Sequence, residues 1–200
     1  MPKADFFQRL GLFAVPRFFD PTFCAAVRVE MRAAAHVAGT VDVGEGDAPV
    51  DLKTRSVQWA RMREETTALI TSRFTELKPQ LERHFNVTLT GSQRPQFLTY
   101  RSGDFYRAHH DNMPARADFV RERQISVVVF LNRMSNAPQP DCHTGGALTF
   151  YGLFDDPAMD TLGFPLESEE GTLIAFRSEV LHGVAPVTSG ERYTIATWFR

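Results

Sequence analysis

The sequence has only two cysteines, Cys24 and Cys142, among its 200 residues. Two thiols are too few for a disulfide framework or for a zinc site made of four cysteines. The stretch from Met1 to Phe7 has no basic segment followed by a continuous apolar run, so no signal peptide is expected. No apolar stretch approaches the roughly 18 residues that a membrane-spanning helix needs. These absences predict a cytoplasmic protein without a membrane partner.

The charge of the chain is nearly balanced. Lysine and arginine total 22 against 24 aspartates and glutamates, which gives a net charge of −2. Without a basic surplus, neither a nucleic acid nor an anionic membrane is an expected partner. A hydrophobic content of 43% and a charged content of 23% are ordinary for a globular protein, and the length suits one domain over residues 1–200. Nothing in these values indicates an oligomeric state.

The first part of the chain has helical patterns. Asp20 followed by Pro21 predicts a helix start, with the aspartate as N-cap, and the helix is expected to run to about His36. A second helical region is predicted over residues 63–85, where apolar residues recur at intervals of three and four. Pro79 falls inside this region and predicts a kink or a break into two helices.

After Gly91 the apolar period changes to two, which indicates strands. Together with a short strand over residues 11–15, the expected strands cover residues 96–101, 105–111, 124–131, 147–151, 172–176, 181–186 and 192–199. Many short strands with Gly and Pro turns favour a double-sheet jelly roll. The predicted fold is therefore mainly β with α. A mainly helical layer (1–90) packs on a jelly-roll, or double-stranded β-helix, core (91–200).

His109 and Asp111 stand two residues apart in a predicted strand. Successive strand side chains point to opposite faces, so these two share one face while His110 points away. His182, in a later strand, is the best candidate for a third ligand. Two histidines and one carboxylate with open positions are the ligand set of non-haem iron oxygenases. Cys142 and His143, by contrast, are predicted to lie in a Pro-rich loop without a metal.

Several motifs around this candidate site follow one another in a recognisable order and spacing. They are Tyr100-Arg-Ser-Gly-Asp-Phe-Tyr106, His109-His-Asp-Asn112, Arg123-Gln-Ile-Ser126, Phe130-Leu-Asn132, Gly145-Gly-Ala-Leu-Thr-Phe150, His182-Gly-Val-Ala-Pro186 and Gly190-Glu-Arg-Tyr-Thr-Ile-Ala-Thr-Trp198. Over about residues 97–200 the sequence resembles the prolyl-hydroxylase-like branch of the iron(II)- and 2-oxoglutarate-dependent oxygenases. The resemblance implies that iron(II), 2-oxoglutarate and O2 are used, with ascorbate as a candidate reductant.

The resemblance also implies roles for residues near the metal. Arg192 corresponds to the basic residue that grips the far carboxylate of 2-oxoglutarate, and a guanidinium suits a carboxylate chemically. Tyr100 resembles the tyrosine that reaches the cosubstrate, and Thr194 is expected on the same strand face as Arg192. Phe130 stands where related prolyl hydroxylases place a second tyrosine, so one hydroxyl contact to the carboxylate is missing here.

The implied activity is hydroxylation of an unactivated C–H bond, with release of succinate and CO2. Asp111 favours hydroxylation over halogenation, since related halogenases leave the carboxylate position empty. A prolyl residue of a protein or peptide is the expected substrate. A free amino acid or small metabolite, or an N-methyl group removed through hydroxylation, stays open within the same chemistry. Tyr106, Arg123 and Trp198 are candidates for the substrate pocket.

Two further expectations follow from composition and position. Residues 39–51 are rich in Gly, Asp, Glu and Pro, and residues 113–116 follow the metal motif, so both are candidates for flexible elements over the substrate. The alternative from another class is a non-catalytic jelly-roll module that binds a metal. Arg192 argues against this alternative, because a plain binding module does not need an anchor for a keto acid.

Overall fold

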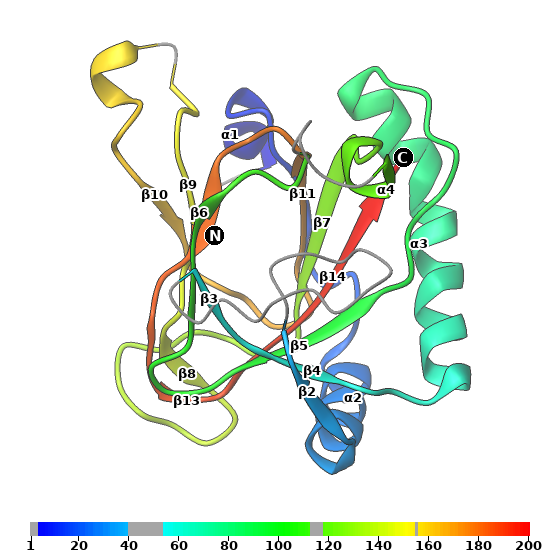
Figure 1. The fold of residues 1–200 in the computed structure, drawn as a ribbon, viewed down its shortest axis with the longest axis vertical. Coiled ribbons are helices and arrows are strands. Elements are labelled where there is room, and N and C mark those ends of the chain that lie inside the picture. The colour runs from blue at the N-terminus through cyan, green and yellow to red at the C-terminus, as the bar shows by residue number, and fades with distance from the viewer. Residues whose placement is uncertain (1–3, 40–53, 113–117, 155) are drawn as a thin grey trace.

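The computed structural model describes residues 4–39, 54–112, 118–154 and 156–200. They form two facing β-sheets, with two long helices along the outer face of the larger sheet (Figure 1). The two segments predicted to be flexible, 39–51 and 113–116, lie outside the described residues apart from Gly39. No helix in the described ranges has both the length and the apolar character that crossing a membrane requires.

The helices begin and end where local chemistry favours it. They are α1 (Ala4–Arg9), α2 (Pro21–Ala33), α3 (Glu64–Phe85) and α4 (Asp118–Arg121), with a 3-10 turn at Pro157–Met159. The side chain of Asp20 accepts a 2.9 Å hydrogen bond from the Phe23 amide, so it is the predicted N-cap of α2. α3 ends at Asn86, whose left-handed backbone is a common helix stop.

Two details of the helix prediction differ from the structure. α2 stops at Ala33, and Ala34 is already extended, so the prediction that places His36 in this helix is wrong. His36 instead begins a short strand that pairs with residues 58–60. α3 is one helix of 22 residues that continues through Pro79, so it is not divided into two helices there. Its buried side chains face the large sheet, and this packing outweighs the backbone hydrogen bond that proline cannot donate.

The larger sheet has seven strands, and all its pairs are antiparallel. In spatial order the strands are β1 (Phe13–Val15), β11 (Leu173–Arg177), β7 (Ile125–Phe130), β14 (Arg192–Phe199), β5 (Gln96–Tyr100), β4 (Gln58–Ala60) and β2 (His36–Ala38). The apolar strand β7 lies near the middle, between β11 and β14, and hydrophobic core residues cover both of its faces.

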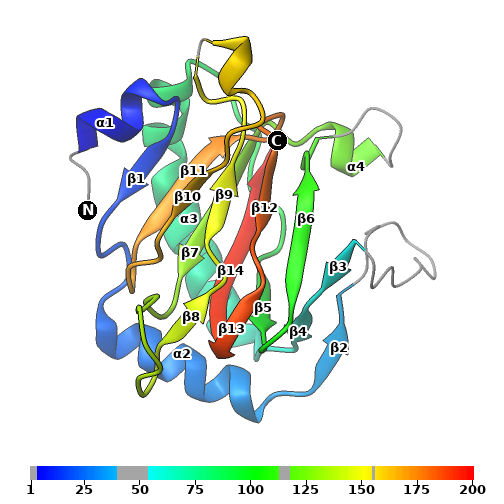
Figure 2. The same ribbon diagram turned by 90° about the vertical axis from the view of Figure 1, so that its left-hand side faces the viewer.

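The smaller sheet has five strands, which Figure 2 shows side by side. In spatial order they are β10 (Phe164–Leu166), β9 (Leu148–Phe150), β12 (His182–Val184), β6 (Phe105–His109) and β3 (Arg55–Ser56). A separate pair joins β13 (Val187–Gly190) and β8 (His143–Gly145).

The hydrophobic core has two layers, one on each face of the large sheet. The outer layer packs α2 and α3 against alternate residues of β7 and β14, such as Val127 and Ile195. The inner layer fills the space between the sheets, with Phe130 and Trp198 from the large sheet meeting Phe150 from the small one. The alternation along β14 therefore directs one set of side chains to the helices and the other set between the sheets.

The predicted jelly-roll fold with N-terminal helices is confirmed by these layers. Of the predicted strand over residues 181–186, only His182–Val184 is a strand (β12), and β13, which was not predicted, begins at Val187. His143 starts β8, so its placement in a loop is wrong. The first 90 residues also add β1 to β4 to the two sheets, and of these only β1 was expected.

Candidate active site

The side chains of His109, Asp111 and His182 meet at one end of the space between the sheets. His109 ends β6 and His182 begins β12, and the two residues are direct partners across these strands. The ligand atoms of the three side chains all lie within 4.8 Å of one another. Nε2 of each histidine is 3.4 Å from an oxygen of the Asp111 carboxylate. Two nitrogens and a carboxylate so arranged are a suitable ligand set for a divalent metal.

Backbone carbonyls orient both imidazoles. Nδ1 of His109 donates to the Arg107 carbonyl and Nδ1 of His182 donates to the Val180 carbonyl, each at 2.9 Å. Because a carbonyl can only accept, Nδ1 carries a proton in each ring, and Nε2 is the nitrogen that faces Asp111. Burial lowers the pKa of His182 to about 4, so this imidazole is neutral, as a metal ligand must be.

Asp111 is held as a carboxylate inside the protein. Burial by itself raises the pKa of this group, but His182, His109 and hydrogen bonds outweigh burial and hold the pKa below its usual range. These hydrogen bonds come from His109 and Trp198. The hydroxyl of Ser126 on β7 also donates to Oδ2 of Asp111 at 2.7 Å. The carboxylate is therefore both ionised and fixed in direction.

His110, the residue between two of these ligands, points elsewhere. Its Nδ1 lies 2.7 Å from the Glu179 carbonyl, and its side chain is exposed. It is not part of the three-residue cluster. The predicted strand over residues 105–111 is too long, because β6 ends at His109. His110 nevertheless points away from the cluster, and this makes it a natural control.

A buried arginine lies in the same pocket as the three ligand side chains. Arg192 is 1% exposed, and its guanidinium sits 5.1 Å from the ring centre of Tyr100 and 5.6 Å from that of Phe130. Its Nη1 donates to the Thr194 hydroxyl at 3.3 Å, while Nε is buried without a hydrogen bond. Within the described ranges no ion pair joins it to a carboxylate, and burial lowers its pKa to about 10. A buried cation without a counter-ion suits an anionic ligand.

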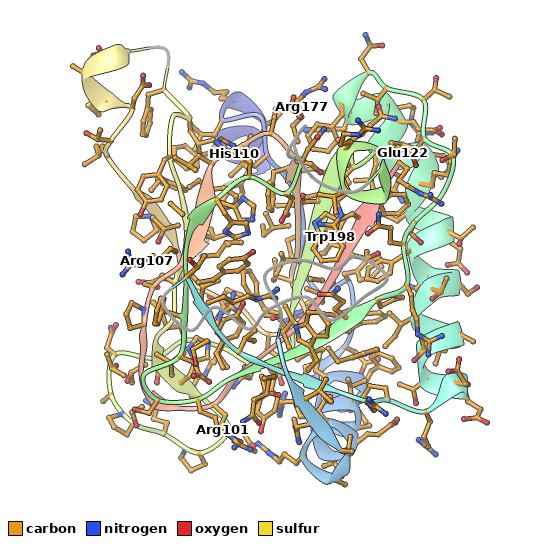
Figure 3. All side chains as sticks on the ribbon, viewed as in Figure 1. Arg101, Arg107, His110, Glu122, Arg177 and Trp198 are labelled. Carbon is orange, nitrogen blue, oxygen red and sulfur yellow. The ribbon has the colours of Figure 1, made fainter. Side chains whose placement is uncertain are left out.

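The remaining predicted residues lie close by, with one difference in position. Tyr106 stacks on His109, with 3.6 Å between ring centres and 17° between planes, and Trp198 lines the pocket between the two sheets (Figure 3). Arg123 is not among the residues that line this pocket. Its guanidinium lies 3.7 Å from the Trp198 ring centre and donates to the Asp111 carbonyl at 3.5 Å, so it lies behind the site.

Two residues that sequence reasoning missed contribute to this region. Ser126 is a polar residue in the otherwise apolar strand β7, and this contrast is the signal that could have singled it out. Arg55 lines the pocket from β3, and nothing in its sequence neighbourhood indicates that position. His143, at the start of β8, is also buried near Arg192, and its two ring nitrogens bond the Gly145 carbonyl and the Ser168 hydroxyl.

Comparisons with known proteins agree with this geometry. Residues 95–200 match the family model described as the 2OG-Fe(II) oxygenase superfamily. A PKHD-type hydroxylase of Shewanella sp. (strain MR-7) is 28% identical over 107 residues, which is 53% of this chain. The match covers only 42% of that relative, so the chain spans about two-fifths of its length.

Two solved structures share the fold. A prolyl-4-hydroxylase of Pseudomonas putida superposes with a TM-score of 0.66 at 23% identity, covering 95% of this chain and 92% of that one. A Trichoplax adhaerens prolyl hydroxylase, in complex with a peptide of the hypoxia inducible factor oxygen degradation domain, reaches a TM-score of 0.72 at 20% identity. It covers 98% of this chain and 86% of that one.

Proposed function

The chain belongs to the 2OG-Fe(II) oxygenase superfamily, and from this premise we propose that it hydroxylates an unactivated C–H bond. The family's metal is iron(II) and its cosubstrate is 2-oxoglutarate, which is consumed together with O2. One observation carries the proposal: a cluster of His109, Asp111 and His182 shares its pocket with Arg192, a buried cation that has no counter-ion in the described ranges.

The residues present fit the metal. His109 and His182 would supply their Nε2 nitrogens and Asp111 a carboxylate oxygen. When bound, iron(II) supplies the oxidising chemistry with O2 and the keto acid. The protein's own part is to orient the three donors, through the Arg107 and Val180 carbonyls and the Ser126 hydroxyl.

The pocket also fits the cosubstrate. Arg192 would bind the far carboxylate of 2-oxoglutarate through its unused Nε–H and its remaining N–H groups, with Tyr100 and Thr194 beside it. The free space between the lining side chains is about 50 Å3, well below a typical ligand pocket of several hundred Å3. Binding therefore requires lining side chains to move apart. Enclosure by the two sheets then keeps bulk water from the reacting groups.

The substrate we propose is a prolyl residue of a protein or peptide. Prolyl hydroxylases share the fold, and the Trichoplax relative is described with a bound peptide. A free amino acid or small metabolite is the alternative within the same chemistry, because this fold accommodates different substrate pockets. Succinate and CO2 are the expected by-products. The use of ascorbate and a place in the cytoplasm stay predictions.

The test is the formation of succinate from 2-oxoglutarate in the presence of iron(II), ascorbate and air. Wild type is expected to form succinate slowly even before a substrate is known, and His182→Ala is expected to lose this turnover. His110→Ala serves as the matched control, since it removes an imidazole that points away from the cluster. Equal turnover in all three proteins would contradict the assignment of the metal site. Failure of wild type to bind either iron(II) or 2-oxoglutarate would favour a non-catalytic module.

A further inference from the structure

Asp111 lies just beyond β6, so strand pairing does not hold it in place. The amides of Asp111 and Asn112 both donate to the Ser178 carbonyl, at 2.9 and 3.1 Å. Two further contacts of the same two residues go to Arg123. Its Nη1 donates to the Asp111 carbonyl at 3.5 Å, and its own carbonyl accepts a 2.8 Å hydrogen bond from Nδ2 of Asn112. Arg123 therefore contacts the segment that carries the candidate metal carboxylate through both its side chain and its backbone.

The guanidinium of Arg123 is buried against the indole ring of Trp198. Its central carbon lies 3.7 Å from the ring centre, and Arg123 is only 6% exposed. Attraction between a cation and the face of an aromatic ring is strongest at such close range and away from water. Nε of Arg123 also donates to the side-chain oxygen of Gln93 at 3.1 Å. These contacts fix the positive charge over the indole ring.

Trp198 connects this cation to the candidate metal site. It lies on β14 and lines the same pocket as the three candidate ligands (Figure 3). Its indole N–H donates a hydrogen bond to the Asp111 carboxylate, and this bond is one of those that hold the pKa of Asp111 below its usual range. A cation on the face of the ring draws electron density from the indole, which makes its N–H a stronger donor. The charge of Arg123 therefore acts on the carboxylate although the guanidinium does not line the pocket.

We propose that Arg123 is a positioning residue of the iron site, which fixes the Asp111 carboxylate through Trp198 and through the Asp111 carbonyl. This inference rests on the proposed oxygenase function and assigns a role to a residue that sequence position had placed in the substrate pocket. A carboxylate that is already held in one direction does not have to be ordered when the metal binds. Partners that orient a metal ligand in this way raise the affinity of the site.

Two other roles for Arg123 would give different results. A residue that contacts the substrate would change substrate binding and leave metal binding unaltered. A residue that only supports the fold would lower the melting temperature without changing how a bound metal is coordinated. A positioning residue instead changes both the affinity and the coordination of the metal, and part of its effect depends on Trp198. This dependence separates the contact with Trp198 from every other contact that Arg123 makes.

The experiment titrates the full chain with cobalt(II), whose visible absorption reports the number and geometry of its ligands. It compares wild type with Arg123→Gln, Arg123→Lys, Trp198→Phe and the double variant Arg123→Gln/Trp198→Phe. Phenylalanine keeps an aromatic face at position 198 but has no N–H. Arg101→Gln is the matched control, because it removes the same charge from an exposed arginine that bonds Glu191 and does not line the pocket. Thermal unfolding of each metal-free protein shows that it is folded.

Arg123→Gln and Trp198→Phe are each expected to weaken cobalt(II) binding about tenfold or more and to shift the absorption of the bound ion. The double variant should bind about 20-fold more weakly than wild type, whereas independent effects would multiply to about 100-fold. Arg123→Lys keeps a charge at the ring but loses the planar guanidinium, so its affinity should be intermediate. Arg101→Gln should match wild type in affinity and absorption.

The positioning role is overturned if Arg123→Gln binds cobalt(II) as tightly as wild type, or if the two single effects multiply in the double variant. If Arg123→Gln does not fold, Arg123→Lys decides, and wild-type affinity together with a wild-type absorption spectrum in that variant overturns the role. Failure of the wild-type chain itself to bind cobalt(II) or iron(II) is a distinct result, because it would overturn the metal site on which the proposed oxygenase function rests.

Discussion

The Ser126 hydroxyl donates a 2.7 Å hydrogen bond to Oδ2 of Asp111, and the Ser178 hydroxyl lies 2.9 Å from the same Ser126 oxygen. Ser126 is on β7 of the large sheet, while Asp111 follows β6 of the small sheet. This contact therefore ties the candidate metal carboxylate to the opposite sheet. It fixes which oxygen of Asp111 is engaged by the protein and which way the carboxylate faces.

Replacement of Ser126 by alanine is expected to weaken metal binding while the fold is retained. The carboxylate would lose the bond that orients it, and loss of such a partner typically lowers metal affinity about 10- to 100-fold. Titration of the protein with iron(II) without oxygen measures the effect. Ser135→Ala, at a half-buried serine whose hydroxyl bonds the Ala137 carbonyl and does not line the pocket, is the control and should bind as wild type does. Equal affinities in both variants would show that Ser126 does not orient the carboxylate.

Replacement of Arg192 is expected to act on 2-oxoglutarate and not on the metal. Arg192→Gln removes the buried charge, and the KM for 2-oxoglutarate should rise about tenfold or more. Arg192→Lys keeps the charge but loses the paired N–H donors of the planar guanidinium. Its KM should therefore be intermediate, and its turnover should recover at high 2-oxoglutarate. Succinate formation over a range of 2-oxoglutarate concentrations gives both constants. An unchanged KM in Arg192→Gln would show that Arg192 does not bind the carboxylate of 2-oxoglutarate.

The sequence predicted the centre of this site well for a simple physical reason. Strand alternation predicts His109 and Asp111 on one face and His110 on the other. The three side chains do separate in this way, although β6 ends at His109 and Asp111 lies beyond the strand. The same alternation along β14 brings Arg192 and Thr194 into one pocket. Local periodicity was sufficient along β14, a strand of eight residues, whereas Asp111 lies beyond β6 and its amide donates to the Ser178 carbonyl.

The parts that were missed depend on contacts between distant segments. The two-residue strand β3 forms by pairing with the edge of β6. A pattern of two residues is too short to predict a strand from the sequence. Arg55 reaches the pocket only through that pairing. His36 is in a strand and not in the predicted helix, because it pairs with Ala60, which is 24 positions away in sequence. Tertiary pairing overrides local propensity in short elements, and such pairing is not visible in a local sequence window.

His143 should make stability depend on pH below neutrality. Burial, together with the nearby Arg192, lowers the pKa of its imidazole from 6.5 to about 4. Because the folded pKa is the lower one, the unfolded chain takes up a proton first as the pH falls. The stabilisation from the neutral ring is complete at pH 7 and is lost between about pH 6.5 and 4. Its full size is at most about 3 kcal/mol.

Urea unfolding of the metal-free protein at pH 7 and pH 5 measures this contribution. His143→Asn keeps a donor for the Gly145 carbonyl but cannot titrate. Wild type is expected to lose about 2 kcal/mol more than the variant between the two pH values. The other histidines are common to both proteins, so their effects cancel in the comparison. Parallel pH dependences would contradict a buried neutral His143.

Gly183 permits the close approach of the two strands that carry the candidate histidines. It follows His182 on β12, and a methyl group there would lie 2.9 Å from the Tyr106 carbonyl oxygen and 3.1 Å from the Ala108 amide nitrogen. These atoms belong to the backbone of β6 and cannot rotate away. Gly183→Ala must therefore push β12 from β6, which separates His182 from His109 and Asp111. We expect a loss of stability of about 1–3 kcal/mol and weaker iron(II) binding.

Gly91→Ala is the matched control, because a methyl group at Gly91 meets no atom within 4 Å. Thermal unfolding and iron(II) titration on both variants test the prediction. If Gly183→Ala lowers the melting temperature but leaves metal affinity unchanged, the spacing of the strands does not set the geometry of the cluster. If both quantities fall together, and Gly91→Ala matches wild type, the strand contact positions the donors. The geometry of the metal site would then depend on the lack of a side chain at Gly183 as well as on the three ligand side chains.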